Sequence, residues 1–457
     1  MVRQALQLAP RITMLLREIH SAEASMSRGH SRRRSLKRSE QAIWDPQRRS
    51  LDPLDLLIAA NRDRMPELLP IKMARMAVSP FAFFRGSVPL MAADLATLPV
   101  THLDVRICGD AHVHNLGAFA GPDGRLYFDI NDFDETVVGP WEWDIKRLAA
   151  SLVLAGREAG DSDELCLQSV RVFMRTYREA MLRFAAMPRL EIARYRVHRQ
   201  FVGPPGKNVL RKAERATPQQ NLEKLTLRRR NGTYAFRDRK PLLTPVSKLQ
   251  AAEVLNALVQ YRQTLLVDRR HLFDFYRPVD VAFKIVGTGS VATRDYVVLY
   301  FADGPHDPLF LQVKEEPPSS YAPFLKGAPG VANQGQRVVE GQRAIQTQSD
   351  LLLGWTAFGG RDYLVRQLSD HKASIADEDL RGKGLAIYAH TCGELLAKGH
   401  ARSGDPCALA GYIGAGPNLD KAIQKFAKAY ADQVTLDYEK FRDAIRSGSI
   451  KAARSSF

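Results

Sequence analysis

Two short segments of the sequence concentrate the side chains that could do chemistry. The first, residues 109–115, reads Gly-Asp-Ala-His-Val-His-Asn and carries Asp110 and Asn115. The second, residues 128–135, reads Phe-Asp-Ile-Asn-Asp-Phe-Asp-Glu, with Asp132 near its centre. A carboxylate, an amide five positions later and a carboxylate on the next hairpin strand suit magnesium-dependent phosphoryl transfer. In that interpretation Asp110 accepts or orients a hydroxyl proton, while Asn115 and Asp132 hold Mg²⁺ against the phosphates of a nucleotide.

Both segments also allow a purely structural interpretation. Aspartate and asparagine commonly cap turns, and Asp132-Phe-Asp134 alone could be a surface hairpin. Both segments occur together, and Trp141-Glu-Trp-Asp144 then opens a helix, which favours the chemical interpretation.

A glycine-rich turn later in the chain offers a place for phosphates. Residues 287–292 read Gly-Thr-Gly-Ser-Val-Ala between two apolar stretches. Backbone amides in such a turn can approach phosphate oxygens closely, because glycine has no side chain. The residues expected to contact a nucleotide here are Gly287, Thr288, Gly289 and Ser290.

Lys314 adds weight to this turn. It lies on the next apolar strand, in Leu309–Glu315, where an inward-facing lysine can pair with the α- and β-phosphates. Glu340, on the following helix, is expected to pair with Lys314 and hold it. The alternatives are a lysine at an exposed strand end and a glutamate on a solvated helix face.

The elements that position the first two segments can be read from the apolar pattern. A strand over 103–108 leads into the first segment, and a turn at 121–124 joins it to a strand over 125–130. Helices are expected over 143–158 and 164–187.

The glycine turn is expected to lie in a β-rich region. Its strands are predicted over 281–287, 294–301, 309–314 and 362–368, with a helix over 334–352. Lys314 and the glycine turn would then belong to one sheet.

The polar motifs resemble the aminoglycoside phosphotransferase branch of the protein-kinase-like superfamily. Cys108-Gly-Asp110, followed by Asn115, is similar to the catalytic loop of that branch, with cysteine replacing its leading histidine. Asn131-Asp-Phe133 is similar to its metal-binding strand.

The resemblance extends to the next helix and implies roles for its residues. Asp144-Ile-Lys-Arg-Leu-Ala is similar to a helix start whose aspartate braces the catalytic loop rather than touching substrate. Asp129 rivals Asp132 as the metal ligand, and the distance from Asp132 to Asp144 suits the family better. ATP and Mg²⁺ are the implied cofactors.

The order of the motifs differs from that of an ordinary kinase, in which the glycine loop and lysine come first. Here they follow Asp110 by about two hundred residues. A circular permutation would explain this order, since chain termini usually lie at the surface and close together. The expected fold is therefore α+β, two-lobed and protein-kinase-like, in a circularly permuted form.

Over roughly residues 45–445 the sequence also resembles the bacterial family DUF2252. The resemblance implies no activity. One departure is Ala292, where the family pattern suggests glycine. The similar pieces are Ser79-Pro-Phe-Ala-Phe-Phe-Arg-Gly86, Gly109-Asp-Ala-His, Asn131-Asp-Phe-Asp-Glu-Thr136, the stretch from Gly139 to Ser151, Gly287-Thr-Gly-Ser-Val and His400-Ala-Arg-Ser-Gly-Asp405.

Five domains or segments are expected. They are a basic flexible arm (1–45), a large helical lobe with the catalytic loop and metal-binding hairpin (46–190), a basic insertion and helix (191–279), a small β-rich nucleotide-binding lobe (280–370) and a helical return to the large lobe (371–457). The insertion is expected to hold little regular structure beyond one hairpin.

Four further residues are candidates for the site or its support. Arg85 follows an apolar run and could reach a phosphate or form a buried ion pair. His112 neighbours the candidate base, although a loop histidine is more often a hydrogen-bonding spacer. Asp134 and His400 are weaker candidates.

The charge of the chain, +16 overall, is local. Residues 28–38 hold six basic and no acidic residues, and residues 194–240 hold fourteen basic and three acidic ones. Solvated loops explain such runs, and so does a surface for an anionic substrate or nucleic acid. Few aromatic residues accompany them, so the sequence gives no support for a base-stacking platform.

The composition bears on where in the cell the protein is expected. No apolar run is long enough to cross a bilayer, and no secretory signal is recognisable at the start. Four cysteines without CxxC spacing suit reduced thiols in a cytoplasm. The expected location is cytoplasmic.

Several functions remain open at this point. The leading one transfers the γ-phosphate of ATP to a hydroxyl of a small-molecule or anionic acceptor, which the sequence does not identify. The same fold would transfer a nucleotidyl group if ATP bound reversed. Two others are a metal-dependent phosphoesterase, suggested by Asp110-Ala-His112, and a non-catalytic nucleotide-binding scaffold.

Overall fold

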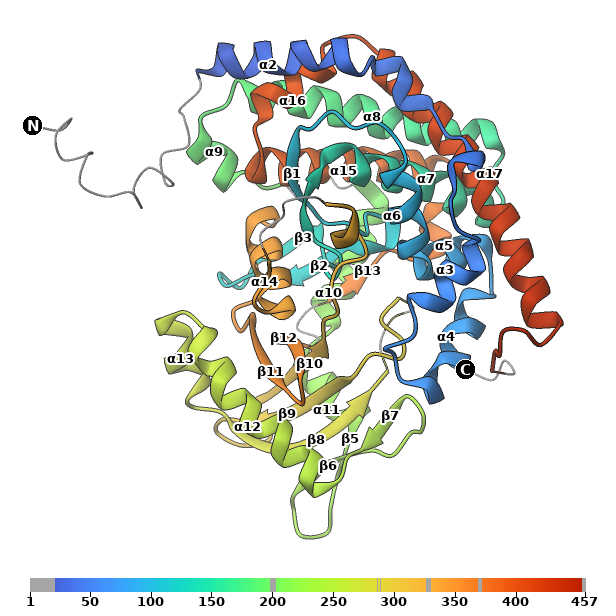
Figure 1. Ribbon diagram of the computed structural model, residues 1–457. Helices are drawn as coiled ribbons and strands as arrows, with labels where there is room; N and C mark the ends of the chain where they lie inside the picture. Colours follow the sequence, from blue (N-terminus) through green and yellow to red (C-terminus); the bar gives the residue numbers. More distant parts are fainter. Residues whose placement is uncertain are drawn as a thin grey trace, which may run out of the picture.

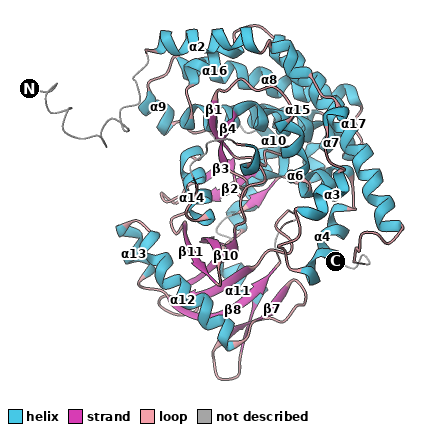
Figure 2. Cartoon of the chain, in the orientation of Figure 1, coloured by secondary structure: helices cyan, strands magenta, loops and turns pink. Residues whose placement is uncertain are grey.

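The computed structural model describes residues 21–197, 203–285, 287, 289–325, 330–368 and 372–453. A helical region is formed by residues 21–197 together with 372–453, and a β-region by residues 226–368 (Figure 1). Figure 2 shows that the largest sheet lies at one end of the molecule and that helices dominate the other. The mixed α+β class predicted from the sequence is confirmed.

Helix α7 (Trp141–Glu158) is the centre of the helical region. Every residue from Trp141 to Gly156 is buried. Acidic residues in its first turn, Glu142 and Asp144, interact favourably with the positive end of the helix dipole. Around it pack three long helices, α8 (Asp163–Ala185), α15 (Lys383–Ser403) and α17 (Asn418–Arg446).

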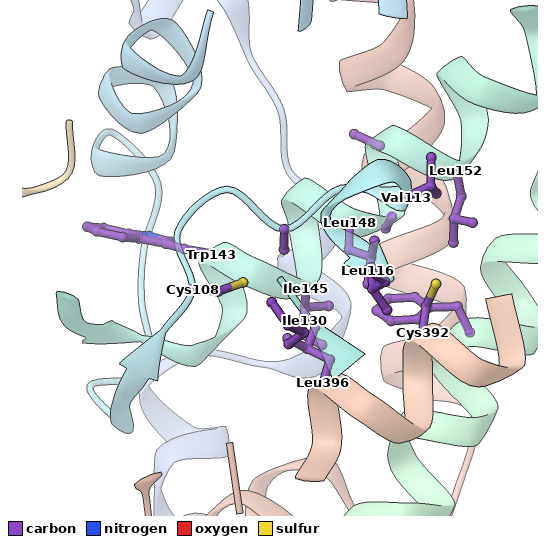
Figure 3. Packing of buried hydrophobic residues seen from close by; sticks show 14 of the residues in the cluster. Cys108, Val113, Leu116, Ile130, Trp143, Ile145, Leu148, Leu152, Cys392 and Leu396 are labelled. Atoms are coloured by element: carbon purple, nitrogen blue, oxygen red, sulfur yellow. The ribbon is translucent and has the colours of Figure 1, made fainter. Parts of the chain in front are cut away.

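Two small sheets lie beside α7. One pairs β1 (Asp104–Ile107) with β4 (Val137–Pro140), and the other orders β13 (Ala373–Ser374), β2 (Leu116–Ala120) and β3 (Leu126–Ile130) side by side. Figure 3 shows side chains from these strands, including Leu116 and Ile130, packed near Ile145, Leu148 and Leu152 of α7. The loops that leave these strands are therefore anchored on a rigid core.

The main sheet of the β-region has six antiparallel strands in the order β11-β12-β10-β9-β8-β7. The four strands predicted around the glycine turn are present as β8, β9, β10 and β12, and β7 and β11 are added. Helix α12 (Lys248–Thr264) covers one face of the sheet, and α14 (Gln334–Ile345) follows β10. The strand bounds are β7 Leu243–Pro245, β8 Arg277–Lys284, β9 Asp295–Phe301, β10 Pro308–Glu315, β11 Gly354–Phe358 and β12 Arg361–Gln367.

The segment predicted as a poorly structured basic insertion is more ordered than expected. Its described part contains α10 (Gly203–Arg215), α11 (Pro218–Leu225) and a hairpin of β5 (Thr226–Arg228) and β6 (Tyr234–Phe236). Proline is compatible with the first turn of a helix, so Pro204 and Pro205 start α10 rather than prevent it. Apolar side chains of α11 and β6 pack on the sheet face opposite α12.

The basic run near the amino terminus is packed on the helical region. Helix α2 (Ala22–Ser35) lies against α16 (Pro406–Ile413), so closely that a Cβ at Gly29 would meet the Ala408 carbonyl oxygen at 2.0 Å. Arg33 and Arg38 donate hydrogen bonds to backbone carbonyls at the end of α16. Over its described residues, this segment is part of the helical region and differs from the separate arm that was expected.

Four short helices carry the chain between α2 and β1. Their bounds are α3 Pro53–Ala59, α4 Leu69–Met76, α5 Pro80–Gly86 and α6 Val88–Ala96. Helix α4 and the segment before it lie beside the glycine turn of the β-region, because Arg64, Met65 and Arg75 donate hydrogen bonds to its carbonyls. Two further short helices are α9 (Arg189–Arg194) and α13 (Val267–Phe273).

Candidate functional site

A cleft of about 970 Å³ brings the separate polar segments together. The helical region contributes Asp110, His112, Asn115, Asp132 and Asp134 to its lining. The β-region contributes the glycine turn and the end of β10, and helices α4 and α5 contribute cationic side chains. Residues almost two hundred positions apart in the sequence therefore face one space.

The loop after β1 is held in place by Asp144. Its carboxylate accepts hydrogen bonds from the backbone amides of Cys108 (2.8 Å) and Gly109 (2.9 Å). Gly109 has φ +81°, and a Cβ there would lie 2.3 Å from the Glu135 carbonyl oxygen, so only glycine fits. The hydroxyl of Tyr321 donates to the Gly109 carbonyl at 2.7 Å. The loop is thus fixed from both regions.

Asp110 is the carboxylate that this loop presents to the cleft. Its side chain is 16% exposed and is paired with the fully buried guanidinium of Arg147, whose Nε donates at 2.7 Å. Burial raises the pKa of Asp110, and the Arg147 charge partly offsets that rise. The amide of Asn115 donates to the backbone carbonyl of Asp110 at 2.7 Å. Asn115 therefore lies beside Asp110 in the lining of the cleft.

The two loop histidines serve the loop rather than the chemistry. His112 Nδ1 accepts from the backbone amide of His114 at 3.2 Å, and burial lowers the pKa of His112 well below its usual range. His112 is therefore neutral, with Nε2 3.7 Å from Asp110. His114 pairs with Asp377 at 2.9 Å. These contacts favour a spacer role.

Asp132, Asp134 and Glu316 gather around one lysine. Lys314 on β10 contacts the carboxylate of Asp134, and its ammonium lies 3.6 Å from Glu316. Burial and the Asp134 charge raise the pKa of Asp132 to about 7. Burial opposes ionisation of Asp134 as well, yet the Lys314 charge holds the pKa of Asp134 well below its usual range. Arg366 adds a second positive charge near Asp132 and Asp134, and burial raises the pKa of Glu316 well above its usual range. A further cation would favour the ionised forms of Asp132 and Glu316.

The donors of this cluster fit a magnesium ion. Magnesium takes oxygen ligands and usually binds through one or two carboxylates plus substrate phosphates. Asp134 Oδ1 and both carboxylate oxygens of Glu316 are buried without a hydrogen bond to the described residues. Across those residues, no group of three or more His, Cys, Asp or Glu side chains is arranged to hold a metal alone. An ion at Asp132 and Asn115 would therefore need phosphate oxygens as further ligands.

Asp129, the rival metal ligand, is occupied elsewhere. It is 3% exposed and contacts the ammonium of Lys398 on α15. Its other oxygen accepts from the backbone amide of Ile130 at 2.9 Å. These contacts leave Asp132 as the carboxylate of this strand that faces the cleft.

The pairing expected between Lys314 and Glu340 does not form. Glu340 is exposed on α14 and accepts a hydrogen bond from Gln336 at 2.8 Å. The buried face of α14 carries Arg337 instead, which donates to the Thr136 carbonyl at 2.7 Å. Glu316, two positions after Lys314 and directly after the end of β10, lies near the place that Glu340 was expected to fill.

The glycine turn is held by the helices beside it. The backbone amide of Met65 donates to the Ala292 carbonyl (2.8 Å), and Arg64 donates to the Val291 carbonyl (2.7 Å). Arg75 on α4 donates to the Gly287 carbonyl. Gly287, Gly289 and Ser290 line the cleft, whereas Thr288 lies outside the described residues.

Arg85 and His400 occupy different positions. Arg85 on α5 lines the cleft, and its buried Nε makes no hydrogen bond to the described residues. His400 on α15 is fully buried behind the loop, where Tyr177 and Asp144 bracket its ring at 2.8 and 3.2 Å. His400 therefore supports Asp144 and does not reach the cleft.

Two residues of this site were missed by sequence reasoning, although signals for them existed. Arg147 stands three positions after Asp144 on one helix, and such residues share a face. Glu316 stands two positions after Lys314, a spacing that places two side chains on one face of an extended chain.

Comparison with known proteins places the chain in a family without adding a function. Neither curated proteins nor solved structures gave a significant match. None of the helices in the described part of the chain combines the length and hydropathy needed to cross a membrane. The family model described as "Uncharacterized protein conserved in bacteria (DUF2252)" matches residues 64–444. The chain belongs to the DUF2252 family.

Proposed function

We propose that the chain is an ATP- and magnesium-dependent phosphotransferase on a circularly permuted, two-lobed kinase-like fold. The observation that carries this proposal is the contact of Lys314 with Asp134, which lines one cleft together with Asp132, Asp110 and Asn115. Lysine, metal-binding aspartate, asparagine and catalytic aspartate are the groups that kinase chemistry needs in one place.

The topology of the β-region supports the same proposal. Strands β8, β9 and β10 follow one another in the sheet, and the glycine turn joins the first two. Lys314 lies on the third strand, as the phosphate-binding lysine of protein kinases does. Helix α14 follows that strand. The permuted order leaves this local arrangement intact.

Asp110 would act on the acceptor. Its carboxylate would accept the hydroxyl proton while the acceptor oxygen bonds to the γ-phosphorus and the bond to the bridging oxygen breaks, releasing ADP. Arg147 fixes the orientation of this carboxylate through Oδ1, so Oδ2 is the oxygen that can face the acceptor. Positioning of this kind supplies much of the rate in phosphoryl transfer.

Lys314, Asn115 and Asp132 would act on the nucleotide. On binding, the phosphates would replace Asp134 as the partner of Lys314 and receive amides from the glycine turn. A bound magnesium ion would supply charge neutralisation at the phosphates. The cytoplasmic setting expected from the free cysteines suits ATP as the donor.

The phosphoesterase alternative has little support in this geometry. Such an enzyme would use Asp110 and His112 as metal ligands, but Arg147 occupies Asp110 with a buried positive charge. A cation that close to a candidate metal site opposes binding of a second cation.

Product analysis tests the proposal and separates its alternatives. Wild type, Asp110→Asn and the exposed-site control Glu340→Gln are incubated with MgATP, and the nucleotides are separated by chromatography. Slow formation of ADP and phosphate that Asp110→Asn abolishes and Glu340→Gln retains is expected. Formation of AMP and pyrophosphate would instead indicate nucleotidyl transfer. Binding of ATP without turnover would indicate a non-catalytic nucleotide-binding scaffold.

A further inference from the structure

Three cationic residues other than Lys314 line the cleft. Arg64 precedes α4, Lys72 lies on α4 and Arg85 lies on α5, so one wall built by the short helices carries all three. The proposed nucleotide site draws its lysine, glycine turn and carboxylates from other elements. Arg64 also donates to the Val291 carbonyl of the glycine turn, but none of the three takes part in the transfer step proposed above.

Burial makes these cations costly unless they bind something. Lys72 is 3% exposed, and its ammonium donates to Asn61 Oδ1 at 2.7 Å. Burial first, and the neighbouring Arg64 charge second, lower the pKa of Lys72 well below its usual range. A pKa lowered this far favours the neutral amine of Lys72, and an anion bound beside it would favour the charged form instead.

Among the described residues, none of the three cations has an acidic partner within 4 Å. Arg64 donates to a backbone carbonyl, that of Val291. Arg85 extends over the Phe81 ring, 5.9 Å from its centroid, with Nε unsatisfied. Guanidinium groups that are half-buried, as these two are, ordinarily meet a carboxylate or a phosphate. Within the described part of the chain, no carboxylate lies that close to either of them.

The acids that line the same cleft are committed to other groups. Glu315 pairs with Arg294 and Arg361, at 3.2 and 2.6 Å. Glu135 accepts hydrogen bonds from the backbone and hydroxyl of Ser320. Both glutamates are hydrogen-bonded to other groups, and their charges act on Arg64 only from beyond ion-pair distance.

Apolar side chains line the cleft alongside the cations, among them Leu56, Val88, Pro89 and Phe324. The lining offers both charge and apolar surface, as pockets for small molecules commonly do. Arg85 also lies near Asp110, since the Asp110 charge is the largest one acting on its guanidinium. A molecule held by Arg85 would thus present its hydroxyl beside the proposed base.

We propose that Arg64, Lys72 and Arg85 form the acceptor subsite, which binds the phosphate or carboxylate group of a small anionic molecule with an apolar portion. This inference rests on the proposed function, because "acceptor" presupposes transfer from a nucleotide. It predicts that an oxyanion and a magnesium nucleotide occupy the cleft at the same time.

Calorimetric titration of the full chain tests the subsite. Inorganic phosphate and malonate are titrated separately into wild type, Lys72→Met, Arg85→Met and the exposed control Lys440→Met, with and without saturating MgADP. At least one oxyanion should bind wild type in the presence of MgADP, and which one binds identifies the anionic group. Its affinity should fall at least tenfold in Lys72→Met and Arg85→Met, while MgADP affinity changes less than threefold.

Four outcomes overturn the subsite. They are failure of both oxyanions to bind wild type, unchanged oxyanion affinity in the variants, displacement of the oxyanion by MgADP, and an equal loss of MgADP affinity in the variants. The last two would assign the cations to the nucleotide. Circular dichroism checks that the variants fold. If wild type binds an oxyanion through Lys72 but does not bind MgADP, the anion site stands and the proposed phosphotransferase fails.

Discussion

The ammonium group of Lys314 contacts the carboxylate of Asp134, a residue 180 positions earlier in the chain. This contact joins β10 of the β-region to the loop after β3 of the helical region. Burial acts to lower the pKa of Lys314, yet the charges of Asp134 and Glu316 raise it overall, so the lysine stays charged. A ligand that takes over Lys314 must satisfy these carboxylates with another cation, which is what a magnesium nucleotide carries.

Asp132 should make stability depend on pH. Its pKa rises from 3.8 to about 7 on folding, so the folded chain binds a proton that the unfolded chain has lost. The protonated Asp132 carboxyl therefore contributes fully to the free energy of unfolding below about pH 4, and this contribution is lost as the pH rises through 7. The free energy of unfolding should fall by at most about 1.4 kcal/mol per pH unit in this range. Urea unfolding from pH 4.5 to 7.5 should show a flatter slope in Asp132→Asn.

A matched control separates titration from metal binding. Asp295 also has a pKa raised to about 7 by burial, but it does not line the cleft. Asp295→Asn should weaken the dependence of stability on pH in the same range and leave magnesium-dependent nucleotide binding intact. Asp132→Asn should weaken that dependence and also lose magnesium-dependent nucleotide binding. An unchanged slope in Asp132→Asn would contradict the account of this carboxylate.

Asp144 should be a positioning residue with a large effect on stability. It is buried and accepts two backbone hydrogen bonds from the loop that presents Asp110. Asp144→Asn should cost about 3 kcal/mol of unfolding free energy, because a buried donor loses a charged acceptor. Asp405→Asn is the control, since Asp405 caps α16 and asparagine caps nearly as well. Equal, small losses in both variants would show that Asp144 does not brace the loop.

Ala292 should tolerate glycine better than valine. It has φ +70° and is 1% exposed, so a conformation suited to glycine is adopted by alanine in a packed site. Relief of strain and the added freedom of the unfolded chain nearly cancel, so Ala292→Gly should change stability by less than about 1 kcal/mol. Ala292→Val should cost more than about 2 kcal/mol, because its branched side chain fits neither the backbone nor the space. Equal thermal midpoints for Ala292→Val and Ala292→Gly would contradict the account of Ala292 as a strained, tightly packed residue.

Arg337 rather than Glu340 should hold α14 in place. Arg337 is buried and donates to Thr136 and Pro317 carbonyls and to Gln334, whereas Glu340 is exposed. Glu340→Ala should change stability by less than about 0.5 kcal/mol, and Arg337→Met should cost about 2 to 4 kcal/mol. A large loss of nucleotide binding in Glu340→Ala would contradict this and indicate that Glu340 does pair with Lys314.

The sequence could predict the strands and the polar loops because their signals are local. The glycines at 121 and 124 mark the hairpin between β2 and β3, and alternating apolar residues mark β9 and β10. Placing two distant segments in one cleft depended on the resemblance to kinases, since spacing alone does not bring Lys314 to Asp134.

The partners of charged residues were harder to predict. Glu340 has the right position after the lysine strand, but Val338 and Val339 set the buried face of α14 and turn Glu340 outward. Which buried cation meets which carboxylate depends on tertiary packing, as Lys398 with Asp129 and Arg147 with Asp110 illustrate.

The most direct test of the central claim is the thermal midpoint measured with ATP, with and without magnesium. Wild type is compared with Asp132→Asn, Lys314→Met and the control Glu340→Ala. At about a hundred times its dissociation constant, a ligand adds roughly 2.7 kcal/mol of stability. A magnesium-dependent upshift in wild type and Glu340→Ala, lost in both Asp132→Asn and Lys314→Met, is the predicted result. No upshift in wild type, or a full upshift in both cleft variants, would contradict a nucleotide site built from these two segments.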